Sequence, residues 1–347
     1  MARVLLLFGG RSAEHEVSCS SAVSVHDALE AAGHRVVAVG IDRDGDWYLP
    51  DTSQRPFRAE GRSVRFSIPS GELRVGDDAI ATDVVFPVLH GPKGEDGSMQ
   101  GVFEISDLAY VGCGVLGSAL AMDKDLAKRI VSDAGVATAP WVLIDREAWT
   151  TDAERMAGVV QRKLSFPVFV KPVAQGSSIG IARASTADEL TAGVSRAFRY
   201  DDKVVVEQGI DGREIEVAVL DGPRASAPGE VVVADGWYTY DAKYADESSR
   251  FEAPADLSPT QAERVRGLAE AAFTALSLDG LARVDFFLDS ATGDFLFNEA
   301  NTMPGFTSIS GFPKMWMASG LSYPQLCDHL VQAALKRQEA RAKLAIR

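Results

Sequence analysis

The amino-terminal part of the chain alternates apolar runs with amphipathic stretches. Residues 3–8 (RVLLLF) form an apolar run typical of a buried strand, residues 16–31 have helical periodicity and end before Gly33, and residues 35–42 (RVVAVGID) form a second apolar run. A strand, a loop, a helix and a strand in this order predict a parallel α/β sheet whose carboxyl-terminal loops can hold ligands. Glu14 lies in the first such loop, where a carboxylate can bind a substrate ammonium or can simply be solvated.

A third strand of this sheet is predicted from the run DVVFPVLH, which ends at His90. A lone histidine is more often structural than catalytic, but His90 ends a strand just before a glycine-punctuated loop, where ligands collect. Between the second and third strands, residues 45–78 are polar and glycine-rich. This composition predicts short antiparallel strands or an excursion at the sheet edge.

The stretch AYVGCGVLG matches the dinucleotide fingerprint G-x-G-x-x-G at Gly112, Gly114 and Gly117. That fingerprint should open a helix within a βαβ unit and be followed, about 20 residues later, by an acid that ends the next strand. Asp133 has this spacing, but it lies within residues 121–135, which have the periodicity of one amphipathic helix. We therefore interpret the glycines as a linker at a domain boundary.

Residues 165–184 predict a hairpin that carries phosphate-binding chemistry. Lys171 ends its first strand, and the loop at 176–180 (GSSIG) is rich in glycine and serine. Such a loop can present N–H and O–H donors to phosphates, while a strand lysine adds a fixed positive charge. The loop is not a Walker motif, because G-x-x-x-x-G-K-[ST] is absent, and a flexible hairpin without a ligand is the alternative.

Residues 203–222 predict a strand, a short connector and another strand, with Glu207 and Glu214 on either side of the connector. Backbone groups of such a connector can hold an adenine, and an acid beside it can bind the ribose hydroxyls. Residues 231–254 mix aromatic and polar side chains and are typical of a mobile lid. Amphipathic helices are expected at 259–276 and, at the end of the chain, 323–343.

Residues 282–305 predict a second hairpin, in which the strands ARVDFFL and FLFNE flank the turn DSATGD. If Ser290 pairs with Asp294 around a three-residue loop whose glycine takes a positive φ, Asp285 falls directly opposite Glu299. Two opposed carboxylates destabilise a sheet unless a positive charge neutralises them.

A divalent cation is the simplest neutralising group for these two acids. Asn301 continues the strand alternation and adds a neutral oxygen, and Arg283 precedes Asp285 on the same face. A set of oxygen ligands suits Mg²⁺ or Mn²⁺ better than zinc. The alternative is an exposed hairpin edge that happens to be acidic. The Pro-Gly turn in TMPGFTS favours the ion site, because its backbone N–H groups would lie close by.

Composition narrows the class of protein. A chain of 347 residues is too long for one ordinary core, so two or three domains are expected, and 46% hydrophobic with 24% charged residues is typical of a soluble globular protein. A net charge of −14 argues against a nucleic-acid partner. No apolar run is long enough to span a membrane. Cys19, Cys113 and Cys327 are too few and too far apart for a disulfide framework, which fits a reducing cytoplasm.

Seven motifs stand in order along the chain: FGGRSAEHEVS (8–18), LHGPKGEDGSMQG (89–101), AMDKDLAK (121–128), FVKPVAQGSSIG (169–180), YDAKY (240–244), ARVDFF (282–287) and NEANTMPGFTSIS (298–310). Together they resemble the D-alanine:D-alanine ligases of the ATP-grasp superfamily. The resemblance covers nearly the whole chain.

The resemblance implies a fold and an activity. An α/β substrate domain (1–120) would precede two ATP-grasp subdomains (121–211 and 212–347) whose antiparallel sheets sandwich ATP, and the last would carry the lid and the metal site. The enzyme would join two D-alanines through a D-alanyl phosphate, releasing ADP and phosphate, in peptidoglycan precursor synthesis. It would work in the cytoplasm as a homodimer, with no nucleic-acid or membrane partner.

The resemblance also assigns roles to residues at matching motif positions. ATP would be bound by Lys124, Lys171, Ser177, Glu207, Gln208, Ile210, Glu214 and Lys243. Mg²⁺ or Mn²⁺, two ions per site, would be held by Asp285, Glu299 and Asn301.

On the substrate side, Glu14 would bind the ammonium of the first D-alanine, with Ser177 and Tyr244 bridging to it and His90 beside it. The tetrahedral intermediate would face Arg283 and the Gly305 amide. Ser310 would hold the carboxylate of the second D-alanine. Gly311 follows it where a bulkier apolar residue is frequent in the family, so we expect that wall to be looser. Tyr244 looks like the dipeptide-forming members, which predicts a dipeptide rather than an ester product.

Without the resemblance, the residues leave three classes open. An ATP- and Mg²⁺-dependent carboxylate-amine ligase is favoured by the acid pair and the lysine-glycine loop. A nicotinamide oxidoreductase rests on the glycines at 112–117. A non-catalytic nucleotide-binding regulator is the third class.

Overall fold

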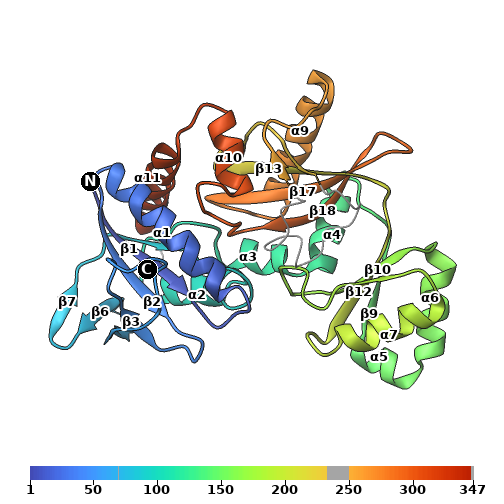
Figure 1. Ribbon diagram of the computed structural model, residues 1–347, viewed down its shortest axis with the longest axis horizontal. Coiled ribbons are helices and arrows are strands. Elements are labelled where there is room, and N and C mark those ends of the chain that lie inside the picture. Colours follow the sequence, from blue (N-terminus) through green and yellow to red (C-terminus); the bar gives the residue numbers. More distant parts are fainter. Residues whose placement is uncertain (69, 233–249, 345–347) are drawn as a thin grey trace.

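The computed structural model describes residues 1–68, 70–232 and 250–344 (Figure 1). Its first sheet is centred on one buried strand. β1 (Arg3–Gly9) lies between β2 (Arg35–Ile41) and β8 (Val84–Pro87) and runs parallel to both. The predicted parallel α/β sheet is therefore confirmed. It is extended by antiparallel strands β3 (Trp47–Leu49) and β4 (Arg62–Ser63), so the whole sheet is mixed.

Short antiparallel strands occupy the polar segment, as predicted. β5 (Arg65–Ser67), β6 (Glu72–Val75) and β7 (Asp78–Ile80) form a small separate sheet. Helix α1 (His15–Ala31) packs on β1, and its apolar side chains join the core beneath the sheet. α2 (Ser98–Ile105) follows the loop after β8.

The glycine motif opens a helix, which differs from the predicted linker. Gly114 is the N-cap of α3 (Val115–Met122), and α4 (Lys124–Asp133) follows directly. The single helix expected at 121–135 is wrong, because the Asp123 carboxylate accepts hydrogen bonds from the Asp125 and Leu126 N–H groups and starts a new helix. Asp133 ends α4, so it does not end a parallel strand, and the dinucleotide pattern is not met.

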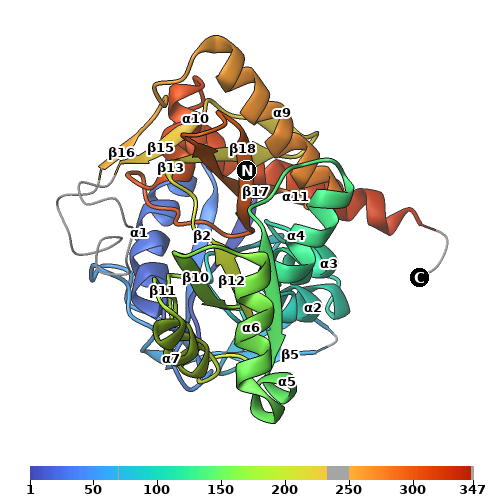
Figure 2. The same cartoon turned by 90° about the vertical axis from the view of Figure 1, so that its right-hand side faces the viewer.

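Two antiparallel sheets follow along the chain and are shown from the side in Figure 2. The second sheet has the order β11-β10-β12-β9, and helices α5, α6 and α7 pack against it around one core. Its elements are β9 (Trp141–Asp145), α5 (Arg146–Thr151), α6 (Ala153–Lys163), β10 (Val168–Pro172), β11 (Ala182–Ala184), α7 (Ala187–Ala197) and β12 (Lys203–Gln208). The predicted hairpin around Lys171 is β10–β11.

The third sheet has the order β16-β15-β13-β17-β18, with β14 paired to β13. Helix α9 (Pro259–Ala275) packs on it and shares its core. The strands are β13 (Gly212–Leu220), β14 (Arg224–Ala225), β15 (Gly229–Val232), β16 (Arg250–Glu252), β17 (Leu281–Asp289) and β18 (Phe295–Asn301). The second predicted hairpin is β17–β18, and Asp285 pairs with Glu299 as expected.

The turn of this hairpin differs from the prediction. Asp289, not Ser290, pairs with Asp294, and the Asp289 N–H donates to the Asp294 carbonyl at 2.9 Å, so the loop has one residue more than expected. That register alone would place Asp285 opposite Asn298. A bulge at Asn298 adds a residue to β18 and restores the pairing of Asp285 with Glu299.

The end of the chain returns to the first sheet. α10 (Gly311–Ala318) lies near β13, and α11 (Tyr323–Ala342) packs against α1 and β8 (Figure 1). His34 is bonded to Asp328 of α11 (Nε2 to Oδ1, 3.0 Å). One hydrophobic cluster therefore contains residues from both ends of the chain.

Two expectations from composition agree with the described residues. The three cysteines are free and buried. Among the helices that the structure describes, none combines the length and apolar character that crossing a membrane requires.

Candidate active site

A cavity of about 720 Å³ lies where the three large sheets meet. Loops after β1, β8, β10 and β18 contribute to its walls together with β13 and β17. Eleven of the residues predicted or found to matter line it: Glu14, His90, Glu95, Ser177, Glu216, Arg283, Glu299, Asn301, Gly305, Ser310 and Gly311.

Glu14, which follows a strand of the first sheet, and Ser177, which follows a strand of the second sheet, are in contact. Glu14 is the N-cap of α1 and is 9% exposed. The Ser177 hydroxyl donates a hydrogen bond to its carboxylate. Ser177 and Ser178 both have positive φ values, 48° and 57°, so the loop after β10 curls back toward α1. The predicted neighbourhood of Glu14 and Ser177 is therefore present.

His90 is buried and bridges the first sheet to the loop after β18. Its Nδ1–H donates to the Met303 carbonyl at 2.8 Å, and its Nε2 lies 3.1 Å from the Ser21 hydroxyl. Burial lowers the pKa of His90, although the nearby Glu14 charge acts in the other direction. A neutral ring with a proton on Nδ1 fits both contacts.

Glu95 is a buried acid in this site that the sequence analysis missed. Its two carboxylate oxygens accept hydrogen bonds from the backbone N–H groups of Gly91 (2.8 Å) and Met303 (3.0 Å). Burial, with a contribution from Glu14, raises the pKa of Glu95 to about 8. The GEDG motif in the loop after His90 contained the only available signal.

Lys171 and Glu207 form a buried ion pair with a third partner, Lys128. Glu207 is 2% exposed and lies 2.7 Å from Lys171 Nζ and 3.3 Å from Lys128 Nζ. Burial opposes every charge in this group, but the two lysines lower the pKa of Glu207, and Glu207 raises the pKa of Lys171. Burial lowers the pKa of Lys128. Lys128 was missed, although it lies one helical turn after Lys124.

Two lysines of the second sheet and α4 reach the bulged strand β18. Lys124 Nζ lies 3.4 Å from Glu299 Oε2 and donates to the Gln175 carbonyl at 2.7 Å. Lys171 Nζ donates to Asn298 Oδ1 at 3.2 Å. Because the bulge directs the neighbouring side chains of Asn298 and Glu299 to one face, both can meet lysines from across the cleft.

Arg283 stands between two acids. Its guanidinium donates to both oxygens of Asp285 (2.8 and 2.7 Å), and its Nε lies 3.2 Å from Glu216 Oε2. Burial opposes the charge, but Asp285 and Glu216 raise the pKa of Arg283 well above its ordinary value. The Asn301 amide also donates to Asp285, at 3.0 Å. Glu216 was missed, although it lies two residues after Glu214, on the same face of β13.

The loop after β18 is held through several of its N–H groups. The Met303 N–H is bonded to Glu95, the Phe306 N–H to Ser21 (3.4 Å), and the Thr307 N–H to Ser310 Oγ (3.1 Å). The Gly305 N–H makes no hydrogen bond within the part of the chain that the structure describes, and Gly305 lines the cavity. Ser310 is the N-cap of α10.

The looser wall expected at Gly311 is not present. A Cβ atom at this position would lie 2.9 Å from Glu216 Oε2 and 2.9 Å from the Phe251 ring. The Phe251 ring and the Glu216 carboxylate therefore occupy the space that a side chain at 311 would need.

The remaining predicted nucleotide residues lie at the junction of the second and third sheets. Gln208 ends β12, and its side chain bonds both backbone groups of Ser165 at 2.8 Å. Ile210 is half-buried in the connector, and Glu214 in β13 raises the pKa of Lys171 through its charge. The lid residues Lys243 and Tyr244 lie outside the described residues.

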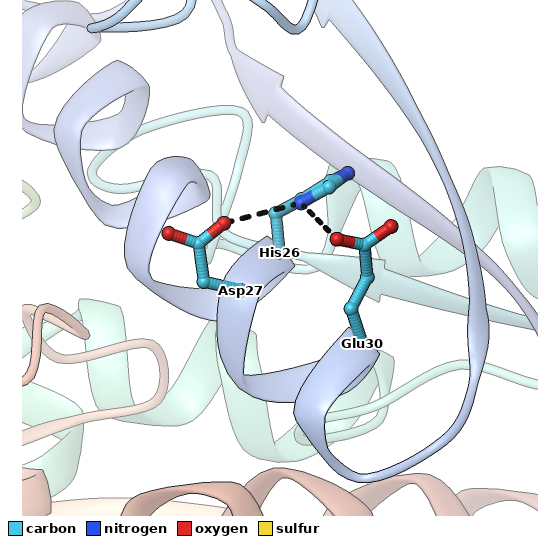
Figure 3. Close-up of side chains that lie close together, drawn as sticks. All are labelled: His26, Asp27 and Glu30. Atoms are coloured by element: carbon cyan, nitrogen blue, oxygen red, sulfur yellow. Dashed lines mark hydrogen bonds and ion pairs between the residues drawn. The ribbon is translucent and has the colours of Figure 1, made fainter.

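A different acidic group, formed by His26, Asp27 and Glu30, stands on α1 (Figure 3), and none of the three lines the cavity. His26 Nδ1 lies 3.4 Å from Asp27 and 3.6 Å from Glu30. Arg55 already pairs with Asp27, at 2.8 Å. The charge of Asp27 is therefore neutralised by protein, and we assign no metal to this group.

The acids of the hairpin fit a hard divalent cation. Asp285 and Glu299 are paired in register, and each forms an ion pair, Asp285 with Arg283 and Glu299 with Lys124. With Asn301 they form a donor set made of oxygen atoms, which is the set that Mg²⁺ and Mn²⁺ prefer. The residues present therefore fit such an ion.

Two antiparallel sheets that enclose lysines and an acidic hairpin, placed after an α/β sheet whose loops reach the same cavity, define the class of ATP-grasp ligases. Two family models match the chain, "D-ala D-ala ligase N-terminus" over residues 3–113 and "D-ala D-ala ligase C-terminus" over residues 130–332. The chain belongs to the D-alanine–D-alanine ligase family.

Individual relatives agree with this membership. The chain is 47% identical over 366 residues to D-alanine–D-alanine ligase A of Bradyrhizobium diazoefficiens, covering 99% of this chain and 97% of the relative. It is 41% identical to D-alanine–D-alanine ligase A of Escherichia coli O6:H1, covering 97% of each.

Solved structures agree as well. The D-alanine-D-alanine ligase from Coxiella burnetii matches with a TM-score of 0.86 and 34% identity, covering 99% of this chain and 96% of that one. The VanG D-Ala:D-Ser ligase from Enterococcus faecalis matches with a TM-score of 0.84 and 34% identity, covering 96% and 99%.

Proposed function

We propose that this enzyme joins two D-alanine molecules to D-alanyl-D-alanine, using ATP and releasing ADP and phosphate, for peptidoglycan precursor synthesis. One observation supports this most. A single cavity is lined by the carboxylate of Glu14, which suits an ammonium group, by the cationic Arg283, and by Ser310 at the N-terminus of a helix. Charges of this kind suit two zwitterionic amino acids bound in sequence.

Glu14 would bind the ammonium of the first D-alanine. Ser177 would orient the Glu14 carboxylate, and His90 would lie beside the bound D-alanine. A carboxylate is a poor electrophile, so phosphoryl transfer from ATP would first convert it to an acyl phosphate. Lys124 and Lys171 would neutralise the phosphates, because both ammonium groups reach the edge of the cleft where β18 begins its bulge.

The nucleotide base would lie against the connector from Glu207 to Ile210, and Glu214 would bind the ribose. Glu207, which is locked between two lysines, would act mainly by fixing Lys171. Gln208 would frame the adenine through its backbone, since its side chain is bonded to Ser165. Lys243 and Tyr244 are assigned to the ATP and substrate sides of the lid on sequence grounds.

Asp285, Glu299 and Asn301 would hold Mg²⁺ or Mn²⁺, as two ions per site. When bound, the metal supplies positive charge against the phosphates. In the structure, the negative charges of Asp285 and Glu299 are balanced by Arg283 and Lys124 respectively.

The second D-alanine would bind with its carboxylate at Ser310 and its body against Gly311. Its amine would attack the acyl phosphate, and phosphate would leave. The Gly305 N–H, which none of the described residues engages, and Arg283 would stabilise the oxyanion, a role in which losing one donor typically costs about 10²–10³ in rate. An acyl phosphate hydrolyses in water, so the lid segment would exclude solvent.

We also propose the three-part division into residues 1–120, 121–211 and 212–347, and a homodimer in the cytoplasm. α2 and α3 contact each other and carry the exposed apolar side chains of Ile105 (64%), Val115 (38%) and Leu116 (61%). Burying this patch against the same patch of a second copy would remove it from water. Sedimentation of wild type and Leu116→Asp would test this, since a monomeric wild type contradicts the dimer.

The activity is tested by product analysis with D-alanine, D-serine and D-lactate as second substrates. Phosphate release should need D-alanine, ATP and a divalent cation together, and the dipeptide should be the main product at neutral pH. A major ester product from D-lactate, or phosphate release without D-alanine, would contradict the proposal.

A further inference from the structure

A second cavity, of about 340 Å³, lies beside the active-site cavity. It opens at the carboxyl ends of β1, β2 and β8, where open α/β sheets bind ligands. Of the described residues that line the two cavities, only His90 is common to both. The second cavity is thus a separate space behind the loop that carries Glu14.

The walls of this cavity are mainly apolar. They include Ile41, Trp47, Leu89, Met99 and Val102. The Trp47 indole is held by stacking on Phe66, with ring centroids 5.3 Å apart and an interplanar angle of 16°. A preformed apolar space of this volume is typical of a small-molecule site, and a rigid indole suits an aromatic or branched aliphatic ligand.

The rim of the cavity has a net positive charge. Arg11 and Lys93 are exposed cations that line it, and Asp44 is the one acid among its described lining residues. Within the described ranges, neither the Arg11 guanidinium nor the Lys93 ammonium makes a hydrogen bond or ion pair, and Lys93 is bonded only through its backbone N–H, which donates to the Asp96 carboxylate at 2.8 Å. The Arg11 chain lies over Gly45, where a Cβ would come within 3.0 Å of its Cδ. One carboxylate on an otherwise apolar ligand would match this rim.

Hydrogen bonds connect this cavity to the candidate substrate site. The Ser12 hydroxyl, which lines it, donates to the His90 carbonyl at 2.7 Å and accepts from the Glu14 N–H at 3.2 Å. His15 Nδ1 donates to the carbonyl of Gly10, another lining residue, at 2.9 Å. A ligand in this cavity would therefore contact the segment at Ser12 that positions Glu14, and it would also contact His90, whose backbone carbonyl accepts the Ser12 hydrogen bond.

We propose that this cavity is a regulatory site for a small apolar carboxylate, coupled to the first D-alanine subsite through Ser12 and His90. The coupling is reciprocal, because any ligand that changes the affinity for D-alanine has its own affinity changed by D-alanine to the same degree. The coupling rests on the proposed D-alanine site, whereas binding of a ligand in this cavity does not.

Titration calorimetry with 4-phenylbutanoate tests the site, and 4-phenylbutanamide is the matched uncharged probe. We expect one carboxylate per chain, with the amide bound about tenfold more weakly or not at all. Adding D-alanine should change the dissociation constant of the carboxylate. D-alanine binding to the same sample is measured first, so that a failure of the proposed substrate site is recognised separately. Absence of carboxylate binding, equal binding of the amide, or no response to D-alanine that itself binds would overturn the proposal.

Variants locate the binding. Val102→Phe should fill the cavity and abolish binding while leaving ligase activity in place, and Met99→Phe is the second filling variant should the first reduce folding. Arg11→Met combined with Lys93→Met should lower the carboxylate affinity to that of the amide. Arg35→Met is the matched control, because Arg35 is an exposed cation at the opposite end of β2. Unchanged affinity in a folded cavity-filling variant would refute the assignment.

Discussion

The Ser177 hydroxyl donates a hydrogen bond to the Glu14 carboxylate, although the two positions are 163 residues apart. This contact joins the phosphate-side loop of the second sheet to the first helix. A substrate ammonium bound at Glu14 would therefore act on the loop that borders the nucleotide through the hydrogen bond from Ser177.

Replacing Glu14 by Gln should raise the KM for the first D-alanine by about 10²-fold, because removing one partner of a buried charge pair costs about 2–5 kcal/mol. The KM for ATP should change far less. Steady-state kinetics with either substrate varied measures the split. Glu30→Gln, at the exposed end of α1, is the control, and equal effects on both KM values would contradict the ammonium assignment.

Replacing Lys171 by Met should weaken ATP binding and lower the free energy of unfolding by about 1.5–3 kcal/mol, because Glu207 loses its closer cation. The protein should remain folded at 25 °C, since a domain's stability is typically larger than this loss. Calorimetry of ATP binding and urea unfolding measure the two effects.

Lys128→Met is the matched control for Lys171, because it removes the other cation of Glu207 from a side chain with no exposed surface. It should lower stability without a comparable loss of ATP affinity. An unchanged ATP affinity in Lys171→Met would count against its phosphate role.

Glu95 should make stability fall as the pH rises. Its pKa is raised to about 8 in the folded protein, so the folded state binds an extra proton between the ordinary carboxyl range, near pH 4.5, and about pH 8. The stabilisation is complete at the acid end of this window and is lost toward pH 8. Glu95→Gln should flatten this part of the profile, measured by urea unfolding at pH 5.5, 7 and 8.5. Glu60→Gln should leave the slope unchanged, and an identical slope in Glu95→Gln would refute the shift.

Replacing Gly311 by Leu should weaken binding of the second D-alanine by about tenfold, because the new side chain would collide with Phe251 and Glu216. Phe251→Ala should partly restore it in the double variant, since the ring is what fills this space. A double-mutant cycle on KM measures the coupling energy. Purely additive effects would show that the two positions do not share the wall.

The site was predictable from sequence where the pattern was local. The pairing of Asp285 with Glu299 followed from alternation and a turn, yet the turn was wrong, and the bulge at Asn298 compensated for it. Asn298 is held by Lys171 from another sheet, a long-range contact that no local pattern contains. The splitting of the predicted 121–135 helix followed from the cap at Asp123, which periodicity alone overlooks.

The missed residues share a physical reason. Lys128, Glu95 and Glu216 are charged side chains whose role depends on burial beside an opposite charge or a backbone donor from a distant segment. Their spacing from Lys124 and Glu214 was a usable signal for two of them. Burial itself depends on how the sheets pack, which the sequence pattern left open.

The packing of α11 on α1 and β8 has a consequence for the order in which the protein is made. The core under the first sheet contains Leu326, Leu330 and Val331 of α11, which are synthesised long after the strands of that sheet. Until then, the apolar underside of a sheet synthesised first lacks part of its cover. We therefore expect the amino-terminal unit to complete its packing only once α11 has been synthesised, and to be the segment that chaperones protect until then.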